Sequence, residues 1–322
     1  MSPVDEAVLA VDLGGTSFRV AVIDRGGNIL GCQRDETRAH EGQQKVLWRL
    51  FQAVRLVMAQ VSTHGIVAIG LATPGPVSPV QGVLLTAPKL PEWRNVPLKA
   101  LLEREFGITA FVNNDANLAA LGESKIGAGK NLQHLVYITW STGIGGGIIV
   151  DGKLFLGAHG LAGELGHIVV EPGGPICGCG NPGCLEAVAS GSAIARMARE
   201  ALARGAVSSM TALYNGRHSA ITAEAVAQAA AGGDTVAQGI LHRAATYMGM
   251  GVVNLIHLFD PQRVIIGGGI SNIGEPVFGP VRQMVDQYTM PNFVKGSEVV
   301  PAQLGDNAGL LGASVWAFQN VG

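Results

Sequence analysis

Two stretches of the chain share one pattern: an apolar run, a polar turn rich in glycine, and a second apolar run. The first turns at DLGGT, residues 12–16, and continues with apolar residues at every second position, Phe18, Val20 and Val22. The second begins at His134 and reads HLVYITW, STGIGGG and IIV. Alternation of this kind predicts strands joined by turns, whereas a Rossmann motif would need a helix after the glycines. Two copies of the pattern predict a duplicated α/β unit with a cleft between the halves.

The rest of the chain alternates between helical and strand periodicity, as expected of an α/β protein. Apolar residues at helical spacing predict helices over 41–60, 97–106, from 115 onward, 191–204, 222–231, 235–259 and 307–318. Short apolar runs predict buried strands over 66–71, 110–113 and 263–266, and TPGPVSPVQG predicts a loop.

Composition limits the partners and the cellular location. The chain has 322 residues, of which 14% are charged, and a net charge of −2. Such a balance provides no electrostatic surface for nucleic acid or an anionic membrane. No apolar run approaches the length of about 20 residues that a membrane span needs, and no basic stretch precedes the first apolar run. We therefore expect a cytoplasmic protein without nucleic-acid or membrane partners.

Three of the four cysteines fall within eight residues, CGCGNPGC at 177–184. In a reducing cytosol, clustered thiols favour a metal site over disulfides. Glycines between Cys177, Cys179 and Cys184 allow the three thiols to converge, and His167 is the nearest histidine for a fourth ligand. A closed shell of this type is typical of structural zinc. Free buried thiols or a redox pair are the alternatives.

The glycine turns are candidate anion sites. Backbone N–H groups in such turns, with threonine hydroxyls beside them, can bind phosphate, and Asp12 at a strand end could hold magnesium through water. The alternative is that both are merely tight turns with a capping aspartate. The chain contains no GxxxxGK[ST] sequence, which argues against a P-loop enzyme.

NNDANLAALGE, from Asn113, contains a candidate general base. Asn114 or Asp115 suits the N-cap of a helix that begins here. Alternatively, Asp115 accepts a proton from an attacking hydroxyl, as an aspartate does in kinases. Spacing alone favours the cap and leaves both readings open.

Taken together, DLGGT, TPGPV, NNDANLAALGE, STGIGGG, GELGH, CGCGNPGCLE and GGGIS resemble the ROK family of sugar kinases, and its bacterial glucokinases most closely. The resemblance covers nearly the whole chain, and the zinc segment is its most specific part. It implies an actin-like ATPase fold, a duplicated ribonuclease H-like α/β architecture with an active-site cleft between two domains. The expected ranges are 1–117 with about 304–322 for the small domain, and 118–303 for the large one.

The resemblance also implies a reaction, transfer of the γ-phosphoryl group of ATP to the 6-hydroxyl of glucose, with Mg²⁺. Asp115 looks like the catalytic base. The residues that look like sugar ligands are Gly75, Asn114, Asp115, Glu164, His167 and Glu186. Those that look like nucleotide ligands are Asp12, Gly14, Gly15, Thr16, Thr142, Gly143, Gly267, Gly268 and Gly269. His167, Cys177, Cys179 and Cys184 match the family's structural zinc site, and a homodimer or homotetramer is expected.

Two positions depart from the family pattern. Ser17 follows the GGT where many relatives have lysine or asparagine, and Trp140 precedes STG where a smaller residue is common. Other substrates stay open, namely N-acetylmannosamine, mannose, fructose, allose and N-acetylglucosamine, as does polyphosphate in place of ATP. A non-catalytic sugar sensor or a ROK repressor is the rival of another class. Because the first strand begins near residue 7, no helix-turn-helix domain is expected before it.

Overall fold

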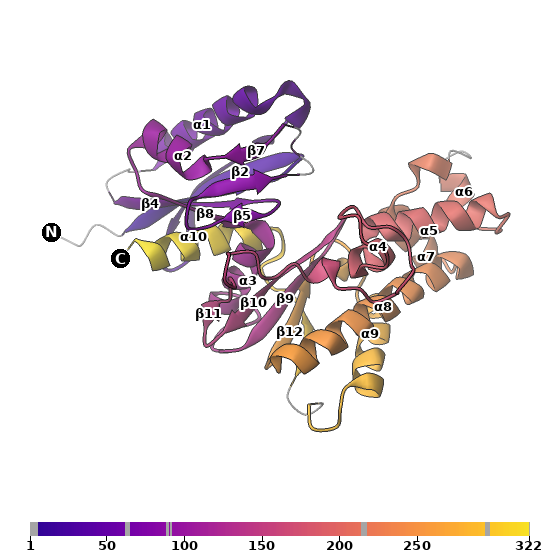
Figure 1. The fold of residues 1–322 in the computed structure, drawn as a ribbon. Helices are drawn as coiled ribbons and strands as arrows, with labels where there is room; N and C mark the ends of the chain where they lie inside the picture. The colour runs from indigo at the N-terminus through magenta and orange to yellow at the C-terminus, as the bar shows by residue number, and fades with distance from the viewer. Residues whose placement is uncertain are drawn as a thin grey trace. The chain divides into compact units, whose positions relative to one another are not determined.

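The computed structural model describes residues 6–61, 65–87, 90, 92–213, 218–293 and 297–321. The chain forms two units (Figure 1). The first comprises Met1–Gln133, Gly147–Gly163 and Gln303–Gly322, and the second comprises His134–Gly146 and Glu164–Ala302. Among the described residues, no helix is both long and apolar enough to cross a membrane.

The first unit is built on a five-stranded sheet in the order β3-β2-β1-β4-β8. Its strands are β1 (Ala7–Leu13), β2 (Ser17–Asp24), β3 (Ile29–Glu36), β4 (Ile66–Thr73) and β8 (Ala110–Asn114). β2 runs antiparallel to β1 and β3, whereas β1, β4 and β8 are parallel. The carboxyl ends of β1, β4 and β8 therefore lie at one edge of the sheet, and these ends carry Asp12, the TPG segment and Asn114.

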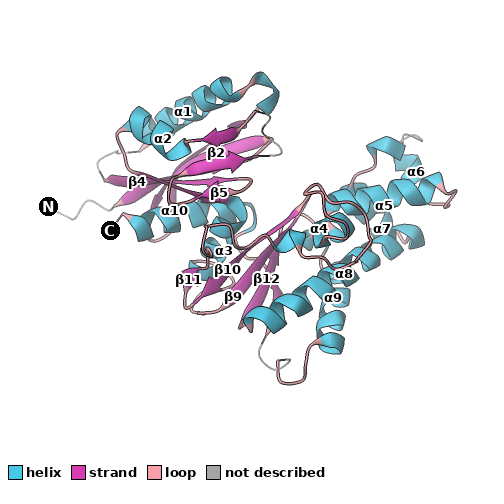
Figure 2. Cartoon of the chain, viewed as in Figure 1, coloured by secondary structure: helices cyan, strands magenta, loops and turns pink. Residues whose placement is uncertain are grey.

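Helices cover both faces of this sheet (Figures 1 and 2). They are α1 (Gln43–Gln60), α2 (Leu98–Phe106), α3 (Asp115–Lys125) and α10 (Ala308–Asn320). Leu9 and Val11 of β1 pack into the apolar cluster that contains α1 and α2, while Val8 packs against Ala317 of α10. Successive side chains of a strand point to opposite faces, so β1 is apolar on both. A small sheet of β5 (Val77–Ser78), β6 (Val83–Thr86) and β7 (Arg94–Val96) lies in the stretch predicted as a loop and just after it.

Close contact between α3 and α10 depends on a glycine, which allows a stringent test of the packing. A Cβ atom built on Gly312 would lie 1.7 Å from the carbonyl oxygen of Leu118, which is backbone and cannot move aside. We expect Gly312→Ala to destabilise the protein by about 3 kcal/mol or more, measured by chemical denaturation. Gly239→Ala, on α8 (Thr235–Phe259), is the matched control, since nothing lies within 4 Å of an added Cβ there. It should be neutral or stabilising by up to about 1 kcal/mol. Equal effects of the two changes would contradict the packing.

The second unit contains most of a sheet in the order β11-β10-β9-β12-β13, the topology of the first sheet repeated. Its strands are β9 (Leu135–Trp140), β10 (Ile144–Val150), β11 (Lys153–Leu154), β12 (Arg263–Gly267) and β13 (Glu298–Pro301). β10 begins in the second unit, and its last four residues together with β11 belong to the first. The repeated order confirms the duplication predicted from the two glycine turns.

Helices α4, α5, α7 and α9 of the second unit pack against the long helix α8, and α6 packs against α7. These helices are α4 (Leu185–Ala189), α5 (Gly191–Ala203), α6 (Met210–Leu213), α7 (Ala223–Ala231), α8 (Thr235–Phe259) and α9 (Glu275–Tyr288). Gly249 and Gly251 allow α8 to approach Met284 of α9 and Leu185 of α4, because an added Cβ would lie 2.5 and 2.7 Å from these side chains.

Most elements predicted from periodicity are confirmed within one or two residues, including α1, α2, α5, α7, α8 and α10. α9 and β13 were not predicted, although Pro276 at the first turn of α9 is a recognisable start signal. The units also differ from the expected domain ranges, because α3 and residues 147–163 belong with the first unit. The packing of Gly122 and Gly312 between α3 and α10 explains the placement of α3. The domain ranges themselves stay a prediction.

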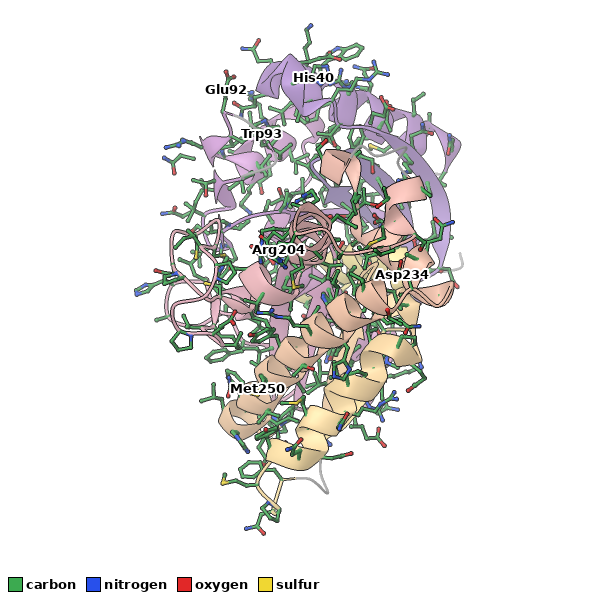
Figure 3. All side chains as sticks on the ribbon, turned by 90° about the vertical axis from the view of Figure 1, so that its right-hand side faces the viewer. His40, Glu92, Trp93, Arg204, Asp234 and Met250 are labelled. Carbon is green, nitrogen blue, oxygen red and sulfur yellow. The ribbon has the colours of Figure 1, made fainter. Side chains whose placement is uncertain are left out.

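Asp234, labelled in Figure 3, caps the N-terminus of α8 and should make a measurable, pH-dependent contribution to stability. It accepts hydrogen bonds from Ala237 N–H (3.0 Å), the hydroxyl of Ser208 (2.7 Å) and the hydroxyl of Ser209 (2.9 Å). Burial alone would raise the pKa of Asp234, but these hydrogen bonds outweigh it and lower this pKa to about 2. Because the folded pKa lies below the unfolded one, the contribution is present above about pH 4 and is lost as the pH falls towards about 2.

Asp234→Ala should therefore reduce the free energy of unfolding by about 1–2 kcal/mol at pH 7, as expected for loss of a cap. The difference from wild type should shrink when urea denaturation is repeated at pH 3. Asp234→Asn is the control, since it keeps the capping oxygen and loses only the charge. A deficit of the alanine variant that is the same at both pH values would contradict the charged cap.

Candidate active site

In the first unit, the DLGGT turn between β1 and β2 has the geometry of an anion cradle. Gly14 N–H donates to Ser17 O at 3.0 Å, and Thr37 donates from its hydroxyl to Gly14 O and from its N–H to Thr16 O. These bonds hold the turn by its carbonyl groups. Among the described residues, nothing accepts from the N–H groups of Gly15 and Thr16, and Thr16 is exposed. Two neighbouring N–H groups are thus available for an anion.

Asp12, at the end of β1, is paired with a residue that the sequence analysis did not single out. Arg19 Nη2 lies 2.8 Å from Asp12 Oδ2, and both side chains are largely buried. Arg19 also donates to Asn307 Oδ1 at 3.1 Å and to the carbonyl of Asp306, at the start of α10. The carboxylate of Asp12 is therefore oriented by the arginine. The ion pair follows from the register of the sheet, because Asp12 and Arg19 are opposite each other in β1 and β2.

The junction of β8 and α3 resolves which residue caps the helix. Asn114 is the N-cap, and its Oδ1 accepts from Ala116 N–H at 2.9 Å and from Asn117 N–H at 3.1 Å. Asp115 is the first residue of α3, half-buried, with Oδ1 accepting from Ala116 N–H at 2.8 Å. Asn114 is therefore the cap, and Asp115 only shares the N–H of Ala116 with it.

Gly75, in the TPG segment after β4, is tied to the same junction. Asn114 Nδ2 donates to Gly75 O at 3.1 Å. Gly75 has a φ of +91°, and a Cβ there would lie 2.1 Å from Thr86 O. Positive φ is accessible to glycine at little cost, so both the conformation and the space require this residue. Three candidates of the first unit, Gly75, Asn114 and Asp115, are thus brought together.

In the second unit, the turn between β9 and β10 is a second cradle. Gly191 N–H donates to Ser141 O at 2.8 Å, and Ser192 donates to Thr142 O from both its N–H (3.1 Å) and its hydroxyl (2.9 Å). The first residues of α5 therefore donate hydrogen bonds to the carbonyl groups of the turn. Of the described groups, none accepts from the N–H of Thr142 or of Gly143. This turn therefore resembles the DLGGT turn: its carbonyl groups are bonded, and two neighbouring N–H groups are not.

The GGG segment, Gly267–Gly269, begins with the last residue of β12 and packs on the end of β9. Gly268 has a φ of +88°, and a Cβ there would lie 2.5 Å from Trp140 O. Gly269 is exposed, with open space around it. The three glycines therefore allow the chain to turn closely over β9 and leave an uncovered backbone at Gly269.

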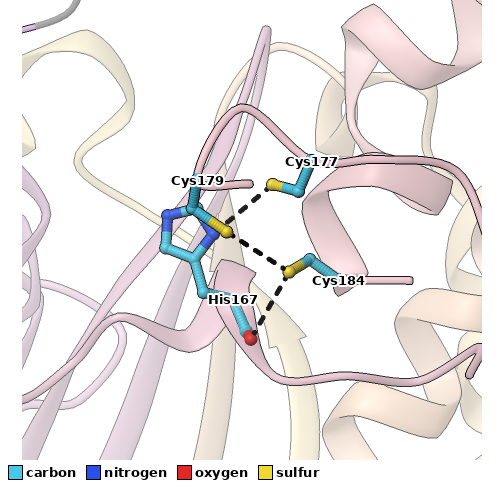
Figure 4. A group of neighbouring side chains, drawn as sticks. All are labelled: His167, Cys177, Cys179 and Cys184. Atoms are coloured by element: carbon cyan, nitrogen blue, oxygen red, sulfur yellow. Dashed lines mark hydrogen bonds between the residues drawn. The ribbon is translucent and has the colours of Figure 1, made fainter. Parts of the chain in front are cut away.

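Four side chains of the second unit converge on one point, as Figure 4 shows. They are His167, Cys177, Cys179 and Cys184, and their ligand atoms all lie within 4.8 Å of one another. His167 Nδ1 is 3.6 Å from Cys177 Sγ, and Cys179 Sγ is 3.6 Å from Cys184 Sγ. Tetrahedral zinc with bonds of about 2.0–2.3 Å separates its ligand atoms by about 3.4–3.8 Å. The two pairs at 3.6 Å therefore match tetrahedral zinc, and the other pairs would have to close by at most about 1 Å.

The electrostatics of the cluster favour a cation. Burial raises the pKa of Cys177, and burial together with the neighbouring thiols raises the pKa of Cys184 to about 12. The N–H of Asn181 is the main cause of a lowered pKa at the exposed Cys179. Three thiolates this close repel one another, and a divalent cation removes that repulsion when it binds. A redox pair would need only two of the sulfurs.

Glu164, His167 and Glu186 are arranged around this centre. His167 Nε2, the nitrogen that faces away from the thiols, lies 3.9 Å from Glu164 Oε2. Glu186 Oε2 accepts from Ile144 N–H at 2.9 Å, and Glu186 Oε1 lies 3.9 Å from Cys177 Sγ. The carboxylate of Glu186 thus joins the cysteine segment to the turn that carries Thr142 and Gly143.

Glu171, between His167 and Cys177 in the chain, makes a contact that the sequence did not indicate. The hydroxyl of Tyr247, on α8, donates to Glu171 Oε1 at 2.5 Å, and Arg243 Nη2 is 3.5 Å from the same oxygen. Burial and the bond to Glu171 raise the pKa of Tyr247, so the hydroxyl stays a donor. No local pattern marks this contact, because its partners are 76 residues apart.

The repeated sheet topology, with a glycine turn after the first strand of each repeat, defines an α/β protein of the actin-like ATPase fold. A model of the ROK family matches residues 8–320. The chain belongs to the ROK family, as the motifs predicted.

Relatives span nearly the whole chain. A glucokinase of Thermotoga maritima is 40% identical over 315 residues, covering 98% of each chain. A crystal structure of a ROK family glucokinase from Streptomyces griseus in complex with glucose and AMPPNP is similar with a TM-score of 0.83 and 37% identity, covering 98% of this chain and 100% of that one. A xylose repressor of Caldicellulosiruptor bescii is 32% identical and covers 95% of this chain, which spans 76% of the repressor.

Proposed function

We propose that this protein is a glucose kinase that transfers the γ-phosphoryl group of ATP to the 6-hydroxyl of glucose. The observation that carries this proposal is its similarity, over 98% of the chain, to a glucokinase crystallised with glucose and an ATP analogue. The 40% identity to the Thermotoga maritima glucokinase supports the same activity.

Asp115 is the proposed general base. It lies at the junction of β8 and α3, where Asn114 already caps the helix. A carboxylate there can accept the proton of the 6-hydroxyl as the oxygen attacks the γ-phosphorus, and ADP is the leaving group. Asn114 and Gly75 would bind the sugar beside it, and the bond between them sets the shape of this part of the site.

In the second unit, Glu164, His167 and Glu186 are the proposed ligands of the other sugar hydroxyls. Carboxylates suit this role because each oxygen accepts hydrogen bonds from hydroxyl groups. Zinc bound by His167 and the three cysteines would brace the segment rather than react, since four protein ligands leave no open position. His167 would give Nδ1 to the metal and direct Nε2 towards Glu164 and the sugar.

The two glycine turns are the proposed phosphate sites. Gly14, Gly15 and Thr16 in one unit and Thr142 and Gly143 in the other present N–H groups, while Gly267, Gly268 and Gly269 would contact adenosine. Mg²⁺ would be held near Asp12 through water, with Arg19 limiting the negative charge of that carboxylate. Phosphoryl transfer depends mainly on such positioning and charge stabilisation.

A sugar-binding repressor without kinase activity is the second candidate, supported by the similarity to the xylose repressor. The position of Asp115 favours the kinase, because neither capping nor sugar sensing by the other ligands requires a base there. A kinase for another hexose would differ in its contacts to the carbons at which that sugar differs from glucose, such as C2 for mannose and C3 for allose.

The test is a coupled ADP-release assay with MgATP and single sugars: glucose, mannose, N-acetylmannosamine, N-acetylglucosamine, fructose and allose. We expect the highest kcat/KM with glucose. Preference for another sugar would replace glucose as the proposed substrate and leave the proposed mechanism unchanged. No turnover with any sugar, combined with sugar binding in calorimetry, would favour the repressor-like candidate.

A further inference from the structure

Trp140 is a departure from the family pattern that the proposed reaction does not use. It is the last residue of β9, next to the turn of Ser141–Gly143, and its side chain is 1% exposed. A buried indole needs a partner for its N–H group. Trp140 Nε1 donates to Ala189 O at 2.7 Å, a short bond in a buried setting.

Ala189 connects this bond to the metal centre. It is the last residue of α4, whose N-cap is Cys184, one of the four metal-binding side chains. The chain then continues through Ser190 into the first turn of α5. Trp140 therefore holds the far end of a five-residue helix whose near end is held by the metal site.

The residues that follow Ala189 shape the phosphate turn. Gly191 and Ser192 donate to the carbonyl groups of Ser141 and Thr142, as described above. Because these carbonyl groups point towards α5, the N–H groups of Thr142 and Gly143 point away from it. Any displacement of residues 189–192 would rotate the peptide groups of the turn and redirect these donors.

The backbone of Trp140 supports the other proposed nucleotide segment. Ile270 N–H donates to Trp140 O at 3.0 Å, and Gly268 packs directly on the Trp140 peptide. One residue thus contacts the metal-bound helix through its side chain and the GGG segment through its backbone. Its neighbours in sequence form the phosphate turn.

We propose that Trp140 is a positioning residue for the nucleotide: its indole bond to Ala189 couples the metal-binding segment to the turn that binds the phosphates of ATP. This inference rests on the proposed function for the identity of the ligand. Sugar binding depends less on this bond, because Glu164 and His167 lie outside α4 and Glu186 keeps its own bond to Ile144 N–H. Loss of the bond should therefore affect ATP more than glucose.

Trp140→Phe tests the coupling, since it keeps an aromatic ring and removes the N–H donor. We expect KM for ATP to rise about five- to tenfold, with KM for glucose changed by less than about twofold. Zinc content should stay equal to that of wild type. Trp93→Phe is the matched control, because Trp93 (Figure 3) is also 1% exposed but its Nε1 has no partner among the described residues. It should leave KM for ATP unchanged.

Ser192→Ala is a second variant that removes an exposed hydrogen bond to the same turn, so folding should tolerate it. It should raise KM for ATP by about two- to fivefold. Unchanged KM for ATP in both variants, or an equal rise in both KM values for Trp140→Phe, would overturn the inference. Binding of MgAMPPNP to each variant, measured by calorimetry without sugar, separates this result from failure of the proposed function. A wild-type chain that binds no MgAMPPNP overturns the proposed function and this inference with it.

Discussion

Asp115→Asn is expected to lower kcat with glucose by about 10²–10⁴-fold, the usual contribution of a general base. An amide at this position cannot accept the proton of the 6-hydroxyl, yet it preserves the size of the side chain. Since Asn114 is the N-cap, the substitution should leave α3 and the stability of the protein essentially unchanged. Glucose binding measured by calorimetry should survive.

The control for this change is Asp286→Asn, an exposed aspartate on α9 outside every proposed site. It should retain full turnover. If Asp115→Asn keeps kcat within tenfold of wild type, the base has been assigned wrongly. If its thermal stability falls as well, the loss of turnover would reflect the fold rather than the proton transfer.

Cys179→Ser is expected to remove zinc and most of the activity together. Cys179 is the exposed member of the cluster, and serine is a much weaker zinc ligand than a thiolate. Without the ion, the segment that carries His167 and Glu186 loses its brace, and Glu186 also contacts the phosphate turn through Ile144. We therefore expect KM to rise for both glucose and ATP.

Cys32→Ser is the matched control, because Cys32 is exposed and lies on β3, outside the cluster. Metal content is measured by elemental analysis after dialysis against a weak chelator. Wild type and Cys32→Ser should hold one zinc per chain. Stoichiometric zinc in Cys179→Ser would disprove the four-ligand assignment, and full activity in a zinc-free variant would disprove the bracing role.

These two predictions depend on different levels of structure. As the proposed base, Asp115 would act through local geometry at the end of one strand, so its variant should affect the chemical step alone. The cysteine cluster acts through a chain of contacts from Cys184 along α4 to Ala189 and Trp140. Its variants should therefore change the binding of both substrates.

Much of the fold could be read from local pattern. Strands flanking the glycine turns, and helices such as α1 and α8, are specified by apolar residues at a period of two or of 3.6, which is a property of short segments. α9 could have been predicted in the same way, because its buried residues, Val277, Phe278, Val281 and Val285, fall at helical spacing. The strands β5, β6 and β7 were missed because elements of two to four residues show no period.

The candidate site divides in the same way. Sequence alone proposed residues for the chemistry, because aspartate, glycine turns and a CxCxxxxC segment with a nearby histidine are chemical signals in themselves. It could not decide whether Asn114 or Asp115 caps α3, since both are suitable caps and only the backbone geometry distinguishes them. Nor could it pair Arg19 with Asp12, Tyr247 with Glu171 or Trp140 with Ala189. Such pairs join segments that are distant along the chain or on neighbouring strands, and their hydrogen bonds exist only after long-range packing has brought the backbone into place.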